Sequence, residues 1–239
     1  CTPTGSLKMM APKSFGNLHL GSALAEFCKQ YPAVKVHLVL ADDPPNNRHF
    51  SDEGLDLALK MSPSSENMII SKRVGYLRWL LCCSPEYAAQ SGQPARPEEL
   101  PAYNCLVHQR TNPGNIWILN GPNGQSSIRV DGSFTANSAL ALRAAVLSGL
   151  GIGFLPAYCV ANDLKMGRLI EVLGDYPIEP RPVYLLYPHK QHIPMKVRLL
   201  IDFISRRFKS HGWSEAECCA QQVIVDLRGG SDSFGESYL

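Results

Sequence analysis

Two short stretches place a polar side chain where a predicted helix begins just after a predicted strand. "APKSFG" covers residues 11–16, and "TANSAL" covers residues 135–140. The first turn of a helix leaves backbone N–H groups without intrahelical acceptors, and the helix dipole adds partial positive charge there. Both stretches therefore favour an anionic group such as a carboxylate, with Ser14, Asn137 and Ser138 as nearby polar groups. A purely structural role for these side chains as helix N-caps stays open.

Three glycines at alternate positions, Gly149, Gly151 and Gly153 in "SGLGIGF", suggest a phosphate-binding loop at first sight. A dinucleotide fingerprint has the spacing G-x-G-x-x-G, follows a strand and opens a helix. Here the spacing is G-x-G-x-G, and the predicted helix precedes the glycines. We therefore predict a helix C-terminus at Gly149, a tight turn at Gly151 and close strand packing at Gly153.

No motif predicts a catalyst, a metal site or a cofactor. Ser14, Ser84 and Ser148 lack the G-x-S-x-G pattern of a nucleophile elbow, and the seven histidines show no metal-ligand spacing. The eight cysteines include no C-x-x-C pair. Their scattered positions argue against a disulfide framework, so a reducing cytoplasm is the expected location.

The composition indicates a folded globular chain. Of 239 residues, 45% are hydrophobic and 18% are charged, with a formal net charge of +2. No run of Lys and Arg exceeds two residues, so the chain is not expected to bind DNA by itself. No apolar stretch approaches the roughly 20 residues that a membrane span requires.

The first 60 residues alternate strands and helices. Strands are predicted at 5–12, 34–40 and 54–60, with a helix over about 15–31 and a shorter one before the third strand. This β-α-β-α-β order is typical of a parallel sheet with helices on its faces.

The rest of the chain continues with short strands and helices. Residues 210–239 have loop composition, so a mobile tail is expected there. Trp117 is expected in the core. The other predicted elements are strands 76–83, 105–109, 152–155, 168–173 and 183–188, a hairpin over 116–130, and helices 84–90, 137–149, from 156 onward, and 194–208.

Six stretches, quoted below and found in this order, carry a family resemblance. Through them, residues 5–208 resemble the effector-binding (regulatory) domain of LysR-type transcriptional regulators. Two departures stand out: the "DDPPNN" loop is about two residues longer than usual, and the tail has no counterpart. The matching stretches are "GSLKMMAPKSFG", "LAEFCKQYPAVKVHLVL", "EGLDLALK", "LCCSPEYAAQSGQPARPEEL", "ANSALALRAAVLSGLGIGFLPAYCVANDLKMGRLIEVL" and "PVYLLYPHKQHIPMKVRLLIDFI".

The resemblance implies an α/β fold of the two-lobed, periplasmic-binding-protein-like (type 2) kind. Each lobe would be a mixed sheet flanked by helices, and two crossover strands would join the lobes. Lobe I would hold residues 5–76 plus 182–209, and lobe II would hold residues 77–181. A winged helix-turn-helix normally precedes this domain and is absent from the chain. The family also implies paired domains, and tetramers in full-length proteins.

The resemblance implies that a small molecule binds between the lobes. Asp43 and Pro44 lie at the cleft edge in the family pattern, His108 ends a strand of lobe II, and Phe154 and Pro156 follow the glycine stretch. Asp42, beside them in the family pattern, is a weaker candidate for ligand contact. The predicted ligand contacts are Pro12, Lys13, Ser14, Phe15, Asp43, Pro44, His108, Asn137, Ser138, Phe154 and Pro156.

The sequence thus predicts a cytoplasmic sensor of a small, carboxylate-bearing metabolite, without enzymatic activity, which acts on DNA only through the absent N-terminal domain. The alternative is a solute-binding protein of a transport system. Cys1 favours that alternative because a mature bacterial lipoprotein begins with a lipidated cysteine. An enzyme on the same fold is the third reading.

Overall fold

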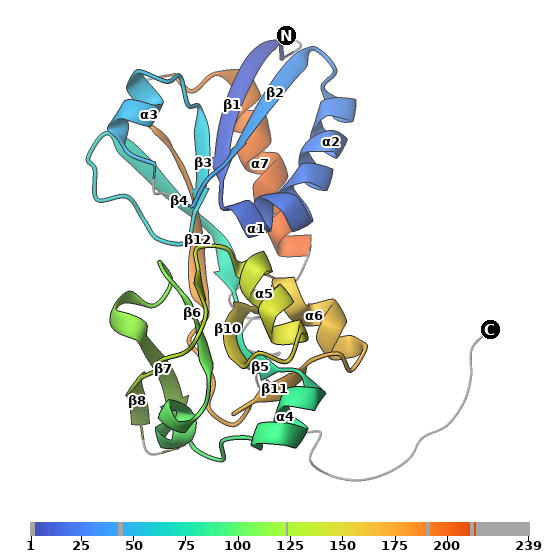
Figure 1. Cartoon of the computed structure of the whole chain (residues 1–239). Coiled ribbons are helices and arrows are strands. Elements are labelled where there is room, and N and C mark those ends of the chain that lie inside the picture. Colours follow the sequence, from blue (N-terminus) through green and yellow to red (C-terminus); the bar gives the residue numbers. More distant parts are fainter. Residues whose placement is uncertain (1–2, 43–44, 123, 190–191, 211–212, 214–239) are drawn as a thin grey trace, which may run out of the picture.

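Two α/β lobes stacked end to end form the molecule (Figure 1). The computed structural model describes residues 3–42, 45–122, 124–189, 192–210 and 213. The sheet of lobe I has the order β2-β1-β3-β12-β4, in which β1 runs parallel to β2 and β3, whereas β12 is antiparallel to β3 and β4. Its strands are β1 (Gly5–Ala11), β2 (Val34–Leu40), β3 (Leu57–Lys60), β4 (Ile69–Leu77) and β12 (Arg181–Pro188).

Helices cover both faces of this sheet (Figure 1). A continuous helical segment is made of α1 (Lys13–Phe15), a π-helical turn η1 (Gly16–Leu20) and α2 (Gly21–Gln30). It lies beside α7 (Met195–Ser210), while the short α3 (Asn47–Ser51) covers the other side. The apolar sides of α2 and α7 pack with those of the strands into one buried core cluster.

The sheet of lobe II has the order β11-β5-β10-β6-β9 and is also mixed, because β10 is antiparallel to β5 and parallel to β6. Helices α5 and α6 cover one side, and a two-stranded hairpin lies on the other (Figure 1). The elements are β5 (Trp79–Cys83), α4 (Pro85–Ser91), η2 (Pro97–Ala102), β6 (Cys105–His108), η3 (Pro113–Asn115), β7 (Ile116–Gly121), β8 (Gly124–Arg129), β9 (Thr135–Ala136), α5 (Ala139–Leu147), β10 (Ile152–Pro156), α6 (Ala157–Lys165) and β11 (Ile170–Val172).

The chain passes between the lobes twice, from β4 into β5 and from lobe II back into β12 (Figure 1). The predicted two-lobed fold with mixed sheets and two crossover strands is confirmed. The single strand predicted at 76–83 is wrong, because Arg78 separates β4 from β5 and the two belong to different sheets. Apolar residues flank Arg78 on both sides, so the hydrophobic pattern alone did not show the break.

The glycine stretch reverses the chain as predicted. Gly149 has φ of 76° after the end of α5, its N–H donates to Val146 O, and the N–H of Leu150 donates to Ala145 O. This pair of bonds is a Schellman motif. A Cβ atom on Gly151 would lie 2.1 Å from Asn104 O, and one on Gly153 would lie 2.6 Å from Val146 Cγ2. Both positions therefore need glycine because the neighbouring atoms are too close for a side chain.

Burial separates core side chains from partly exposed ones. Trp117 is fully buried in lobe II, as predicted. Cys105 and Cys159 are buried, whereas Cys28 is only partly buried. The predicted tail has two described residues, Ser210 at the end of α7 and Trp213; its other residues lie outside the described part of the chain. Trp213 packs against Phe208, at 5.0 Å between ring centroids.

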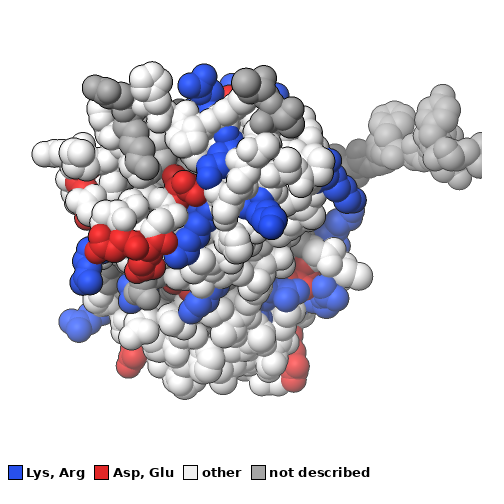
Figure 2. Space-filling view, turned by 90° about the horizontal axis from the view of Figure 1, so that it is seen from above, with Lys and Arg blue, Asp and Glu red and all other residues white. Residues whose placement is uncertain are grey.

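Charged groups are interspersed with uncharged surface on the face of the molecule seen in Figure 2. Basic side chains there stand beside acidic ones, in keeping with the small net charge. Within the described residues, no helix combines the length and apolar character needed to cross a membrane. The same residues hold no cluster of His, Cys, Asp or Glu that could bind a metal ion.

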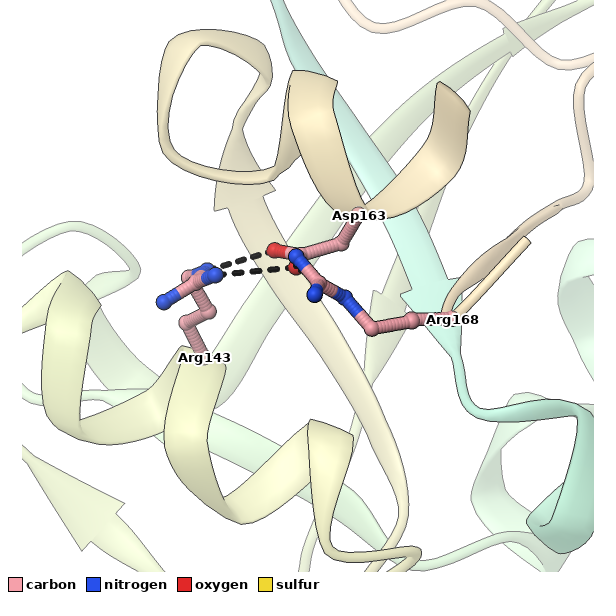
Figure 3. Close-up of polar contacts among 3 residues, drawn as sticks. All are labelled: Arg143, Asp163 and Arg168. Atoms are coloured by element: carbon pink, nitrogen blue, oxygen red, sulfur yellow. Dashed lines mark hydrogen bonds and ion pairs between the residues drawn. The ribbon is translucent and has the colours of Figure 1, made fainter. Parts of the chain in front are cut away.

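A buried carboxylate joins α5 to α6 (Figure 3). Asp163 of α6 is fully buried, and its Oδ2 accepts a hydrogen bond of 2.5 Å from Arg143 Nε of α5. Its Oδ1 accepts hydrogen bonds from Arg143 Nη2 (2.9 Å) and Arg168 Nη2 (2.6 Å). Burial favours the neutral acid, but the hydrogen bonds from the two guanidinium groups outweigh it and lower the pKa of Asp163.

We predict that Asp163→Asn lowers the free energy of unfolding by about 2 to 3 kcal/mol, because the two arginines lose their buried carboxylate. Chemical denaturation at neutral pH measures the change. The exposed Asp175→Asn is the matched control and should change stability by less than about 0.5 kcal/mol. The folded-state pKa of Asp163 lies below the unfolded value of about 3.9, so its stabilisation is complete above that pH and is lost as the pH falls further. Equal stability of Asp163→Asn and wild type at neutral pH would contradict this role.

Candidate ligand-binding cleft between the lobes

A cavity of about 480 Å³ lies between the two lobes. Its volume is in the range of small-molecule sites. One wall comes from the carboxyl ends of β1, β2 and β3 of lobe I, where ligands bind in open α/β sheets. The lining residues are Met10, Pro12, Ser14, Ala41, Asp42, Pro45, Leu59, Lys60, Met61, Ser62, Trp79, His108, Arg110, Thr111, Ala139, Pro156, Tyr158 and Arg181.

The lobe I wall is built around the start of α1. The backbone N–H of Lys13 donates to Asp42 Oδ1 at 3.0 Å, and Lys13 Nζ lies 3.8 Å from Asp42 Oδ2. Asp42 thus caps the helix and fixes the loop after β2 against the loop after β1. Ser14 follows in the first turn of α1, is 6% exposed and lines the cavity.

On the lobe II wall, His108 presents a defined ring to the cavity. Its Nδ1 accepts hydrogen bonds from the backbone N–H groups of Arg110 and Thr111, both at 3.3 Å. A ring whose Nδ1 accepts two N–H groups carries its proton on Nε2. Burial is the largest effect on its pKa and lowers it, the charge of Arg181 acts in the same direction, and Asp42 opposes them. His108 is therefore a neutral hydrogen-bond donor at pH 7.

Arg181 stands at the return crossover, as the first residue of β12. Its guanidinium carbon lies 4.6 Å from the ring centroid of Trp79 and 5.6 Å from that of Phe154. Both terminal nitrogens donate to Thr111 O at 3.2 Å. Among the residues that the structure describes, no carboxylate forms an ion pair with it, and burial lowers its pKa. The cleft therefore contains a largely buried cation without a counter-ion among these described residues.

Four of the predicted contact residues line this cavity: Pro12, Ser14, His108 and Pro156. They come from both lobes, so the structure brings together the two regions that the sequence pointed to. Ala139 lines the cavity from the start of α5, directly after the predicted pair Asn137 and Ser138.

The other predicted residues that the structure describes do not line the cavity. Phe15 is 2% exposed and packs in the lobe I core, and Phe154 is 1% exposed behind Arg181. Ser138 accepts from the N–H of Ala141 as the N-cap of α5. Lys13 and the exposed Asn137 are absent from the lining, and Asp43 and Pro44 lie outside the described residues.

Sequence reasoning missed most of the charged lining. Lys60 is the last residue of β3, and Met61 and Ser62 follow it, so the rule that ligands bind beyond strand ends could have predicted all three as lining residues. Arg181 carried no such signal, because it begins a strand rather than following one. Tyr158 lies in the first turn of α6 and packs edge-on against Phe15 of lobe I, at 5.4 Å between ring centroids.

Residues 2–209 match the family model of the LysR substrate binding domain. AaeR, an HTH-type transcriptional activator of Escherichia coli K12, is 29% identical over 212 residues, which cover 88% of this chain and 67% of AaeR. PtxR, an HTH-type transcriptional regulator of Pseudomonas aeruginosa, is 28% identical over 203 residues, 84% of this chain and 63% of PtxR. The chain thus spans about two thirds of the length of these relatives.

Solved structures show the same likeness. The regulatory domain of CrgA, a LysR-type transcriptional regulator from Neisseria meningitidis, superposes with a TM-score of 0.75 at 26% identity, over 85% of this chain and 98% of CrgA's. Full-length AphB, a virulence activator of Vibrio cholerae, superposes with a TM-score of 0.74 at 28% identity, over 84% of this chain and 68% of AphB's. A solute-binding protein of a transport system is not favoured by these matches. The chain belongs to the LysR substrate-binding domain family and is an effector-binding domain of a LysR-type transcriptional regulator.

Proposed function

We propose that this domain senses a small, carboxylate-bearing metabolite in the cleft between its lobes. The observation that carries the proposal is Arg181, a largely buried guanidinium that lines the cleft without an ion pair to any described carboxylate. A bound carboxylate supplies the missing counter-ion, and a charge-assisted hydrogen bond in a partly buried site is stronger than one in water.

The other polar groups of the cleft also suit an anion. His108 offers Nε2–H, Ser14 offers a hydroxyl, and Lys60 and Arg110 add positive charge at the lining. Asp42 is the acidic lining residue, and its ion pair with Lys13 reduces its repulsion of an anion. Apolar lining from Met10, Trp79 and Tyr158 accommodates the carbon skeleton of the ligand.

A ligand held by both walls stabilises one arrangement of the lobes. We take residues 5–76 with 182–209 and residues 77–181 as the two bodies that close around it, with the crossovers as hinges. The ligand shifts the equilibrium between open and closed arrangements only by as much as its affinity for the closed arrangement exceeds its affinity for the open one. In a full-length protein, this shift would alter the packing of paired or tetrameric copies and so DNA binding by an N-terminal winged helix-turn-helix. The relatives are named as regulators, in keeping with a domain that binds without catalysis.

We predict that small carboxylates raise the melting temperature of the domain and that matched primary amides do not. Acetate, succinate and benzoate are compared with acetamide, succinamide and benzamide by thermal denaturation, because a ligand that binds only the folded state raises its stability. Arg181→Met should remove the effect of the carboxylates, since it deletes the buried cation and keeps a long apolar side chain.

Arg129→Met is the matched control, because Arg129 is exposed on β8 and does not line the cleft. This variant should keep the full response to carboxylates. Stabilisation by the amides equal to that by the carboxylates, or an unchanged carboxylate response in Arg181→Met, would count against an anion site at Arg181.

We also predict that His108 makes the domain less stable as the pH falls through the range below about 6.5, the ordinary pKa of an unfolded histidine. Burial lowers the pKa of His108 in the folded state below that value. As the pH falls, the unfolded chain therefore takes up the proton at a higher pH than the folded chain does, and this stabilises the unfolded state. Urea denaturation between about pH 7.5 and about pH 5.5 should show a smaller decline for His108→Gln than for wild type.

The exposed His37→Gln serves as the control and should follow the wild-type decline. A pH dependence of His108→Gln that matches wild type would show that His108 is not the buried neutral group described here.

A further inference from the structure

A second cavity, of about 470 Å³, lies in lobe II on the other side of Arg181. It shares Thr111 and Arg181 with the cleft, and its lining, within the described residues, includes none from the carboxyl ends of β1, β2 or β3. Its walls come from β7 and β8, the turn before β7 and the segment that leads into β12. The lining residues are Thr111, Asn112, Ile116, Ile118, Gln125, Phe154, Ile178, Glu179, Pro180, Arg181 and Pro182.

Most of the cavity surface is apolar. Ile116 and Ile118 project from the same side of β7 and are 42% and 45% exposed, so together they present apolar surface to the cavity. Phe154 and Ile178 contribute from the lobe II core. The two ionisable side chains of the lining, Glu179 and Arg181, have opposite charges. The cavity therefore suits an uncharged molecule with an apolar body.

One buried polar atom of the lining has no partner. Asn112 is 4% exposed, its Nδ2 donates to Ile116 O at 3.4 Å, and its Oδ1 accepts no hydrogen bond. A buried acceptor left unpaired destabilises the fold by about as much as a lost hydrogen bond. Asn112 is among the residues that line the cavity, but its Oδ1 is buried in this arrangement, so contact with a hydroxyl donor requires rotation of the side chain about its long 3.4 Å bond to Ile116 O.

We propose that this cavity is a second ligand site, which takes a small uncharged molecule with an aromatic or branched apolar body and one hydroxyl group. The apolar body packs on Ile116 and Ile118, and the hydroxyl donates to Asn112 Oδ1. The site does not depend on an anion in the cleft. Because both cavities touch Arg181, an occupant of one cavity alters the surroundings of the other, and any resulting coupling of affinities is reciprocal.

The test is a titration of the chain, labelled at the isoleucine δ1 and methionine methyl groups, with p-cresol and with its methyl ether 4-methylanisole. Ile116 and Ile118 report on the second cavity, and Met10 and Met61 report on the cleft. We expect p-cresol to shift the signals of the two isoleucines, and we expect 4-methylanisole, which has no hydroxyl donor, to bind about tenfold more weakly.

Two variants locate the site. Asn112→Leu should lower the affinity for p-cresol about tenfold. Asn162→Leu, on the exposed side of α6, should leave this affinity unchanged. If Asn112→Leu does not fold, Ile118→Ser tests the apolar wall instead, because it changes a partly exposed side chain. It should lower the affinity for p-cresol several-fold. Shifts confined to Met10 and Met61, equal affinity for the two probes, or unchanged p-cresol binding in Asn112→Leu and Ile118→Ser would each overturn the proposal.

Discussion

A cation held between two lobes, with no carboxylate partner in the described part of the chain, is the constraint on which the architecture of the cleft depends. Arg181 loses much of its hydration where the chain returns to lobe I, and the rings of Trp79 and Phe154 together with Thr111 O replace only part of it. The aromatic pair is itself stacked at 5.3 Å and belongs to the lobe II core, so the guanidinium has a fixed position. An anion that enters the cleft meets a charge that is already oriented.

The topology places this charge where closure acts on it. Each lobe has its own apolar core, and two chain crossings connect them. Contacts between the lobes include the edge-on packing of Tyr158 against Phe15 and His19. Residues from both lobes line the cleft. In the proposed function, a ligand that contacts both walls biases the arrangement of the lobes and leaves each core as it is.

The sequence predicted those features that depend on local chemistry. Strand β2 and the helix end at Gly149 follow from alternation and from the left-handed conformation that glycine adopts. Ser14 and His108 could be predicted as cleft residues because both lie near strand ends. Arg181 and Trp79 could not be found in this way, because their roles arise from the crossing of the chain between two sheets. Phe154 lies in β10 with a ring that is 1% exposed and packs in the lobe II core, and the sequence does not show which way the ring points.

The central claim is that a carboxylate occupies the cleft at Arg181. The most direct measurement is a crystal structure of the domain with a carboxylate that stabilises it. The account predicts a carboxylate oxygen within hydrogen-bond distance of the Arg181 guanidinium, with His108 Nε2 also facing the ligand. A stabilising carboxylate found outside the cleft, with the surroundings of Arg181 unchanged, would contradict it.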